Sequence, residues 1–270
     1  MRVIDVRRLS VAEIVQHLTR YRIPPESLLR ALARDRRALV RRLVERARKA
    51  AAEARAEAAR LRGLYREERR RLRIGQIVAG IDEVGCGPLA GPVVAAAVVL
   101  RPSPPIRGLD DSKRLRREER EALITEIRDR AEAIAVAEAS VEEIDRWNIL
   151  GATRLAMQRA VAQLTPPPGF LLIDGRHVLP NGFPQTAIVK GDATCACIAA
   201  ASIVAKIARD RMMLELDRQY PEYGFARHKG YATVEHLAAL DRHGPSPIHR
   251  RAFLPERQLA LFAPESIEGP

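Results

Sequence analysis

The chain has 270 residues, of which 47% are hydrophobic and 30% charged, a composition that supports a folded core rather than wholesale disorder. Its length suits one large domain, or one ordinary domain with an appendage. The three cysteines exclude a disulfide framework and a paired CxxC zinc site. The N-terminus lacks the apolar stretch of a signal peptide, and the longest uncharged run, residues 84–100, is interrupted by glycines and prolines. We therefore expect a soluble protein of the cytoplasm.

Positive charge is concentrated in the first quarter of the chain. The formal net charge is +12, and residues 1–73 hold 22 lysines and arginines against 9 acidic residues. Residues 74–270 are nearly balanced, with 24 basic residues against 25 acidic ones. A basic segment joined to a near-neutral body favours binding to a polyanion, most simply a nucleic acid. A solvated, arginine-rich helix without a ligand is the alternative.

The basic segment has the pattern of three helices. A capping box at residues 10–13 predicts the start of the first helix, which Pro24-Pro25 ends, and a second helix runs from about 26 to 33. Apolar residues then recur at steps of four and three over residues 40–72, which predicts one long helix with a narrow, alanine-rich face. Glu68 is the one polar residue on that face. The small residues allow close approach to another helix, although a freely solvated arm is also possible.

From Gly75 onward, short apolar runs alternate with helical patterns. We expect strands at residues 77–81, 93–100, 133–139, 170–173 and 186–189, and helices at 116–129, 141–164, 193–219 and 233–243. The segment 133–139 could also be helical, because it is rich in alanine. Strands interleaved with helices predict an α/β fold with a mixed sheet. The first two strands are joined too tightly for a parallel crossover and should pair antiparallel.

Four acidic residues come directly after predicted strands. Asp82 and Glu83 follow the first strand, Asp174 follows the fourth, and Asp192 follows the fifth and opens a long helix. Ligands of α/β sheets gather at strand ends, and clustered carboxylates repel one another unless a cation lies between them. The set therefore indicates a site for Mg²⁺ or Mn²⁺, although a turn explains Asp174 alone and a helix N-cap explains Asp192 alone.

The neighbouring residues Asp82 and Glu83 raise a geometric question, because successive side chains of a strand point to opposite faces. Both reach one site only if the strand bends at Glu83, which the glycines that follow would permit. Carboxylates that hold two metal ions about 4 Å apart are the usual apparatus of phosphodiester hydrolysis. One ion activates water and the other stabilises the leaving 3′-oxygen. Together with the basic segment, this set indicates a nuclease.

Several motifs of the sequence resemble those of a known family. Residues 80–94, GIDEVGCGPLAGPVV, are similar to the first motif of type 2 ribonuclease H, that is, ribonuclease HII. Further matches follow in order at Asp111-Ser112-Lys113, Ile173-Asp174-Gly175, Lys190-Gly191-Asp192-Ala193, residues 198–206, Arg209-Asp210-Arg211, residues 220–225, residues 228–231 and His249-Arg250. They span about residues 75–255 and are specific as a set. The arginine-rich segment before them resembles the extension of longer bacterial members.

The resemblance implies an RNase H-like catalytic domain at residues 74–270, with a mixed five-stranded sheet flanked by helices and a helical C-terminal part. It implies a small all-helical, substrate-binding extension at residues 1–73. The implied activity is endonucleolytic cleavage of the RNA strand of RNA–DNA hybrids and incision 5′ to single ribonucleotides in duplex DNA, giving a 3′-hydroxyl and a 5′-phosphate. The implied cofactors are two Mg²⁺ or Mn²⁺ ions. The expected partners are RNA–DNA hybrids and ribonucleotide-containing DNA, bound by a monomer without a membrane.

The resemblance also implies roles for individual residues. Its metal-binding catalytic carboxylates are Asp82, Glu83, Asp174 and Asp192, and its substrate-binding residues are Gly85, Cys86, Gly87, Lys190 and Tyr231. Tyr231 matches the tyrosine that packs on the deoxyribose beyond the junction, with burial in the core as the alternative. Lys190 matches a basic residue near the site, with a solvated surface lysine as the alternative. Lys113 could support the site or orient its loop, and His249 could contact phosphate or anchor the C-terminal segment.

One tripeptide departs from the family pattern. The family normally has Gly-Arg-Gly where this chain has Gly85-Cys86-Gly87, the element that detects the ribose 2′-hydroxyl through its backbone. The glycines still allow close backbone approach, but the guanidinium is lost and a thiol does not replace it. We expect hydrolysis to survive while affinity and junction selectivity fall.

Two other functions are alternatives to that of a ribonuclease HII. The chain could be a different RNase H-like nuclease, or a non-catalytic nucleic-acid-binding protein.

Overall fold

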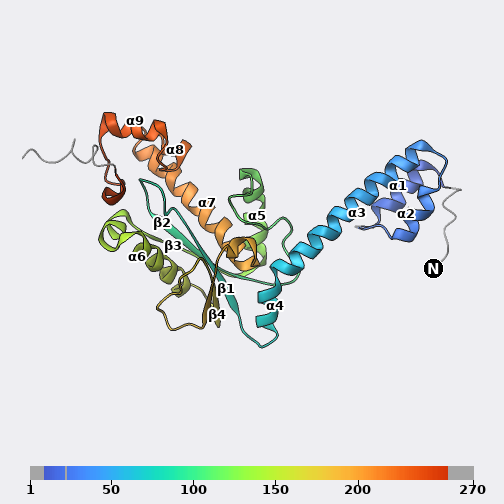
Figure 1. The fold of residues 1–270 in the computed structure, drawn as a ribbon, viewed down its shortest axis with the longest axis horizontal. Helices are drawn as coiled ribbons and strands as arrows, with labels where there is room; N and C mark the ends of the chain where they lie inside the picture. The colour runs from blue at the N-terminus through green and yellow to red at the C-terminus, as the bar shows by residue number, and fades with distance from the viewer. Residues whose placement is uncertain (1–8, 22, 255–270) are drawn as a thin grey trace, which may run out of the picture. The chain divides into compact units, whose positions relative to one another are not determined.

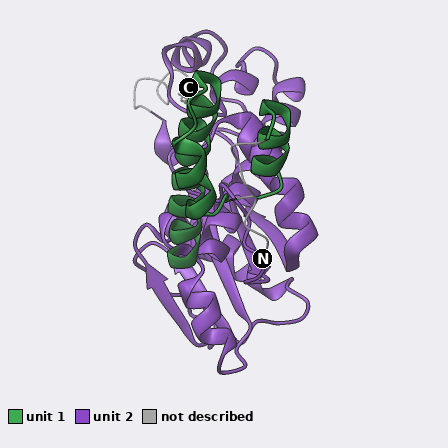
Figure 2. Cartoon of the chain, turned by 90° about the vertical axis from the view of Figure 1, so that its right-hand side faces the viewer, with its two compact units in different colours: residues 1–63 green, residues 64–270 purple. Residues whose placement is uncertain are grey.

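The computed structural model describes residues 9–21 and 23–254. The chain forms two compact units, Met1–Gly63 and Leu64–Pro270 (Figure 2). The division lies after residue 63, whereas the charge pattern placed it at residue 73. Within the described residues, no helix is both long enough and apolar enough to cross a membrane.

The first unit contains α1 (Val11–Thr19), α2 (Glu26–Ala33) and most of α3 (Ala38–Leu64). The predicted capping box is present, because the Ser10 hydroxyl accepts from the Glu13 amide while the Glu13 carboxylate accepts from the Ser10 amide. A small apolar cluster joins the three helices through Ile14, Leu29, Leu32, Val40 and Val44. The unit therefore has a core of its own.

The prediction of one continuous helix over residues 40–72 is wrong. The helix ends at Leu64, and a short helix, α4 (Arg66–Leu72), follows after a break at Tyr65. Tyr65 is fully buried, and its hydroxyl accepts a hydrogen bond from the Ile106 amide at 3.1 Å. An apolar step pattern does not reveal such a break, because Tyr65 fits the spacing of the predicted face.

The second unit contains the predicted mixed sheet, built from β1 (Val78–Val84), β2 (Val93–Leu100), β3 (Ala131–Ala139), β4 (Phe170–Asp174) and β5 (Gln185–Ile188). The strand order is β3-β2-β1-β4-β5. As predicted, β1 pairs antiparallel with β2, and it pairs parallel with β4 on its other side. The alanine-rich segment is a strand, and it pairs antiparallel with β2.

Two long helices cover the two faces of the sheet, α6 (Val141–Ala162) and α7 (Ala196–Gln219) (Figure 1). Alternate residues of β1 face them, with Ala79 in the cluster that contains α6 and Val78 in the cluster that contains α7. Gly80 permits the contact with α7, since a Cβ atom there would overlap the backbone of Cys197. This close approach brings the start of α7 directly onto the central strand.

The remaining elements of the body are α5 (Arg117–Arg130), η2 (Gly191–Ala193), α8 (Phe225–His228), α9 (Val234–His243) and η3 (Arg251–Phe253). Two predicted boundaries are wrong. The strand expected to end at residue 81 continues to Val84, so Asp82 and Glu83 lie inside β1. The helix expected from residue 193 begins at Ala196, so Asp192 lies in the separate turn η2.

Candidate active site

The carboxylates lie at the carboxyl ends of parallel strands. In the β1–β4 register Ile81 pairs with Ile173, so Asp82 and Asp174 are the next residues of neighbouring strands. The turn that carries Asp192 follows β5, and the Gly191 amide donates to Oδ1 of Asp174 at 2.7 Å. The side chains of Asp82 and Asp192 are buried, with 5% and 6% exposure. The topology therefore brings residues more than 100 positions apart to one end of the sheet.

The adjacent carboxylates of β1 lie on different faces of the sheet. Asp82 faces α7, where the Ser202 hydroxyl hydrogen-bonds to it. Glu83 faces α6, because its Oε1 accepts from the Cys86 thiol, which also contacts Thr153 of that helix. The expected bend of the strand at Glu83 is absent, since β1 remains paired with β2 to Val84.

The carboxylates nevertheless form one electrostatic group. Burial raises the pKa of Asp82 well above its ordinary value, and the charges of Glu83 and Asp174 raise it further. Burial and Asp174 likewise raise the pKa of Glu83. The pKa of Asp192 is raised by burial, then by Asp111 and Asp174. Each of these three ionised forms is disfavoured by a negative neighbour, so negative charge is in excess at this end of the sheet.

A cleft of about 550 Å³ opens at this end of the sheet. Its lining includes Asp111, Lys113, Asp174, Lys190 and Asp192. Burial alone would lower the pKa of Lys113, but the carboxylates of Asp111, Asp82, Asp192 and Asp174 together raise it. Lys113 therefore stays protonated beside the acidic group, in keeping with a supporting role. The sequence pattern did not predict Asp111 as part of this group.

Ser202 is a second residue that the sequence pattern did not single out. Its hydroxyl lies 2.8 Å from that of Ser112, and both residues are buried. The hydrogen bond from Ser202 favours the ionised form of Asp82. A signal was present in the sequence, because Ser202 interrupts an otherwise apolar run over residues 196–205.

The side chains at this site are of the chemical type that binds a hard divalent cation. They offer carboxylate oxygens, which Mg²⁺ and Mn²⁺ prefer, and their raised pKa values show an excess of negative charge. Across residues 9–21 and 23–254, no three His, Cys, Asp or Glu side chains already converge closely enough to hold a metal ion. One oxygen of Asp174 is instead turned toward the Gly191 amide.

Comparison with known proteins decides the family. The family profile described as Ribonuclease HII matches residues 79–255, and the profile described as Ribonuclease HII N-terminal domain matches residues 10–71. The chain belongs to the ribonuclease HII family. It is 48% identical over 254 residues to Ribonuclease HII of Desulfitobacterium hafniense (strain DSM 10664 / DCB-2), which covers 94% of this chain and 97% of that protein. It is 60% identical over 187 residues to Ribonuclease HII of Dechloromonas aromatica (strain RCB), covering 69% and 95%.

Solved structures agree with the ribonuclease HII assignment. Ribonuclease H2 from Pyrococcus horikoshii OT3 superposes with a TM-score of 0.54 at 27% identity, covering 65% of this chain and 92% of that one. The ribonuclease HII of a PCNA complex from Archaeoglobus fulgidus superposes with a TM-score of 0.56 at 26% identity, covering 69% and 100%. The chain is thus a metal-dependent ribonuclease H that cleaves the RNA strand of RNA–DNA hybrids. The relatives do not support the alternatives of a non-catalytic binding protein or another RNase H-like nuclease.

In this ribonuclease HII, the loop after β1 and the residue at position 231 lie together. A Cβ atom on Gly87 would be 3.8 Å from the ring of Tyr231. Tyr231 is 45% exposed, which excludes the alternative that it is a core residue. Lys190 is exposed at the cleft and adopts a left-handed backbone conformation, with φ 57° and ψ 41°.

Three other residues lie away from the lining of the cleft. Cys195, just before α7, and Cys197, inside it, are buried as small apolar side chains. His249 is 3% exposed, and its Nδ1 accepts a hydrogen bond from the Ser246 amide. Its Nε2 lies 3.0 Å from Nε2 of His236, inside an aromatic cluster. This burial fits an anchoring role for His249 rather than contact with phosphate.

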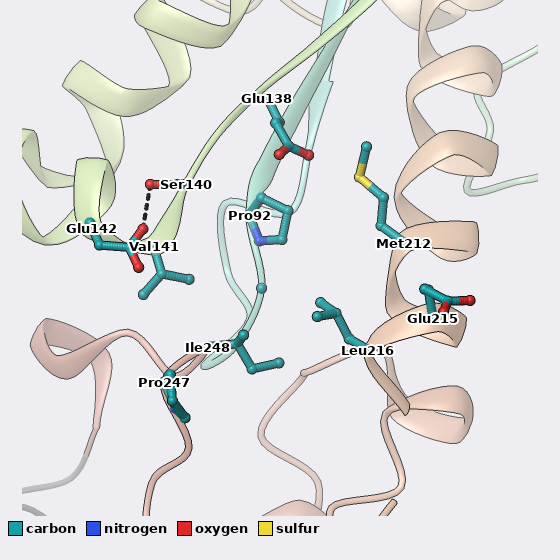
Figure 3. A pocket seen from close by; sticks show the side chains of 11 residues that line it. Pro92, Glu138, Ser140, Val141, Glu142, Met212, Glu215, Leu216, Pro247 and Ile248 are labelled. Atoms are coloured by element: carbon teal, nitrogen blue, oxygen red, sulfur yellow. Dashed lines mark hydrogen bonds between the residues drawn. The ribbon is translucent and has the colours of Figure 1, made fainter. Parts of the chain in front are cut away.

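A second pocket, of about 320 Å³, has a different character. Pro92, Val141, Met212, Leu216 and Ile248 supply apolar surface, and three glutamates also line it (Figure 3). Figure 3 shows the hydrogen bond from Ser140 to Glu142 at one side. None of the clustered carboxylates lines this pocket, so it is not part of the candidate active site.

Proposed function

We propose that this ribonuclease HII also incises duplex DNA 5′ to single embedded ribonucleotides, leaving a 3′-hydroxyl and a 5′-phosphate. In this proposal, two Mg²⁺ or Mn²⁺ ions are held by the carboxylates of Asp82, Glu83, Asp174 and Asp192. The observation that supports it is the placement of these carboxylates at one end of the sheet, where burial and neighbouring negative charges raise the pKa values of Asp82, Glu83 and Asp192. Divalent cations would relieve this repulsion, and when bound they supply an activated water and stabilise the leaving 3′-oxygen.

Side chains and backbone amides of the protein orient the carboxylates and supply positive charge to the cleft. Ser202 and the Glu83 amide donate hydrogen bonds to Asp82, which favours its ionised, ligating form. The Gly191 amide orients Asp174 in the same way. Lys113 keeps its proton and places positive charge at the cleft, where a phosphate group of the substrate can approach.

The substrate contacts are a further part of the proposal. Gly85-Cys86-Gly87 would approach the ribose 2′-hydroxyl through its backbone, and Tyr231 would pack on the deoxyribose beyond the junction. The exposure of Tyr231 next to Gly87 supports this arrangement. Lys190 would contact a phosphate, which its exposed position on the cleft supports.

At the level of the chain, residues 1–73 would bind duplex nucleic acid through their positive charge, and residues 74–270 would carry the reaction. We further propose that the protein acts as a monomer in the cytoplasm, in DNA replication and the excision of ribonucleotides. Three cysteines without disulfide partners support a reducing compartment.

The test is product mapping on a DNA duplex that contains one ribonucleotide. The wild-type chain should cut only 5′ to the ribonucleotide and should leave an all-DNA duplex intact. Asp82→Asn should lower the rate by more than about 100-fold, since even the loss of a group behind a metal ligand costs about 10–100-fold. Binding, measured by fluorescence anisotropy, should persist in this variant.

Asp110→Asn is the matched control, because Asp110 pairs with Arg114 rather than lining the cleft. This variant should cut at the wild-type rate. Equal cutting of the all-DNA duplex, or full activity of Asp82→Asn, would show that the proposal is wrong.

A further inference from the structure

Two arginines with no exposed surface lie beneath the loop of residues 85–92. Arg209 belongs to α7, and Arg250 directly precedes η3. In the part of the chain that the structure describes, neither forms an ion pair with a carboxylate; their guanidinium groups instead contact backbone carbonyls. Buried cations without an acidic partner are unusual, so their surroundings call for an explanation.

The two guanidinium groups bind nearly every carbonyl of the loop. Arg250 donates to Gly85 (2.6 Å), Cys86 (3.2 Å), Pro88 (2.9 Å) and Gly91 (2.9 Å). Arg209 donates to Ala90, Pro92 and Lys229, each at 3.0 Å. The Arg250 amide completes the set by donating to the Leu89 carbonyl. The loop carbonyls therefore point toward the arginines.

The amide groups of the loop are used differently. The amides of Leu89 and Gly91 donate to the carbonyls of Gly230 and Ile248. Within residues 9–21 and 23–254, no backbone or side-chain acceptor pairs with the amides of Cys86 and Gly87. Consecutive free amides backed by positive charge form a concave site for an electron-rich oxygen, such as that of a phosphate or a hydroxyl.

The charge beneath the loop is not neutralised. Burial and the charge of Arg209 together lower the pKa of Arg250 to about 10. Arg250 therefore remains protonated at neutral pH, because this value lies well above 7. The carbonyl dipoles stabilise the two charges locally, yet a net positive charge remains under the free amides.

The backbone of the loop also packs closely against the side chain of Arg209. Gly85 has a φ of +93°, and a Cβ atom there would overlap Nε of Arg209. Only glycine accepts both the backbone angle and the close approach of the guanidinium. The loop conformation and the buried arginines therefore depend on each other.

We propose that Arg209 and Arg250 are positioning residues that hold the 85–92 loop so that the free amides of Cys86 and Gly87 select a ribonucleotide phosphodiester. Neither arginine touches substrate, because neither is exposed. The inference rests on the proposed contact between Gly85-Cys86-Gly87 and the substrate, and it names the residues that give this contact its selectivity.

The test uses Arg250→Lys and Arg209→Lys in the full chain. Lysine keeps the charge but lacks the planar fork, so it cannot hold several carbonyls at once. We expect KM for a DNA duplex with one ribonucleotide to rise about tenfold or more, as the loss of a charge-assisted hydrogen bond implies. The Kd for an all-DNA duplex of the same sequence and the kcat for the single-ribonucleotide duplex should change much less. The selectivity ratio, which is the Kd for the all-DNA duplex divided by the KM for the single-ribonucleotide duplex, should therefore fall.

Arg159→Lys is the matched control, because Arg159 also donates to a backbone carbonyl, that of Glu138, but lies outside the loop. Its selectivity ratio should equal that of the wild type. An unchanged ratio in a folded Arg250→Lys or Arg209→Lys chain would overturn the inference, as would an equal loss of affinity for both duplexes. If the wild type itself does not cut at single ribonucleotides, the proposed function fails instead.

A second measurement does not require an arginine variant that folds. Hydrogen exchange is followed at the amides of Cys86 and Gly87 in Asp82→Asn, which should bind without cutting. These amides should exchange more slowly with the single-ribonucleotide duplex than with an all-DNA duplex of the same sequence. Equal exchange with both duplexes would overturn the inference.

Discussion

The side chain of Cys86 is half-buried and packs against the core on the α6 face of the sheet. Its Sγ contacts Thr153 at 3.5 Å and Glu83 at 3.8 Å, and burial raises the pKa of the thiol to about 11. The thiol is therefore protonated at neutral pH, which argues against a nucleophilic role. Because a protonated thiol is neutral, Cys86 adds no positive charge for the substrate.

Replacement of this residue tests what the missing guanidinium contributes. Cys86→Arg should lower KM for the single-ribonucleotide duplex about tenfold, because an arginine too large for the inward position would extend toward the phosphates and add a charge-assisted hydrogen bond. Steady-state kinetics on that duplex provide the measurement. Cys86→Ala, which removes the thiol without adding charge, should keep the wild-type KM. Identical KM and kcat for Cys86→Arg and the wild type would refute the expectation.

At the scale of elements, the short helix α4 joins segments that carry cleft residues. Oε1 of Glu68 accepts from the Cys197 amide at 2.8 Å, at the start of α7. The Arg71 guanidinium lies 3.5 Å from the centre of the Phe170 ring, at the start of β4. The hydroxyl of Tyr65, just before α4, binds the loop that leads to α5. The helix thus stabilises three supports of the acidic group.

The buried carboxyl of Glu68 gives a pH-dependent prediction. Burial raises its pKa above the ordinary 4.5, so its contribution to stability is complete at low pH and is lost as pH rises through the raised pKa. Glu68→Gln keeps an oxygen acceptor for the Cys197 amide and carries no charge. Its free energy of unfolding should therefore increase relative to the wild type as pH rises above 4.5.

Glu68→Ala is the contrasting variant, because it leaves the Cys197 amide without an acceptor. It should lower the free energy of unfolding by about 1–3 kcal/mol, the cost of an unsatisfied buried donor. Urea unfolding of the three chains between pH 4 and pH 8 measures both effects. Equal stability of the alanine variant and the wild type would mean that the hydrogen bond does not hold α7.

At the scale of the whole molecule, the basic residues and the clustered carboxylates lie in different units, so we expect substrate affinity and catalysis to depend on different parts of the chain. The clustered carboxylates lie in the unit formed by residues 64–270, while residues 1–63 are strongly basic. Electrostatic attraction to the phosphate backbone does not depend on sequence and weakens as salt displaces it. We therefore expect the basic unit to act on affinity.

Deletion of residues 1–63 should raise KM and flatten its dependence on salt, while kcat stays within a few-fold of the wild type. The cut belongs after Gly63 rather than after residue 73, since Tyr65, Glu68 and Arg71 pack into the body. KM measured from low to high salt provides the readout. A full chain with Arg42, Arg46 and Lys49 changed to Gln is the control, and its salt dependence should fall between the two. A salt dependence unchanged by the deletion would contradict the prediction.

The amino-acid sequence was sufficient for the parts of this protein that depend on local pattern and motif. The capping box at Ser10, the strands of the sheet and the family match all follow from residues near one another in the chain. Acidic residues after apolar strands also pointed to the end of the sheet where the carboxylates lie, although the strand was expected to end before Asp82.

Tertiary structure alone decided the contacts between distant segments. The contact of Tyr65 with Ile106, the burial of Glu68 against α7 and the contacts of Arg209 and Arg250 with carbonyls of the 85–92 loop join residues 41 to 165 positions apart. No local pattern reveals these contacts. A sequence pattern predicts that an arginine or a glutamate is exposed, and such a residue is buried only where a distant segment of the chain packs against it. Whether it can be buried depends on close approaches such as that of α7 to Gly80, which exist only after the sheet and helices have packed.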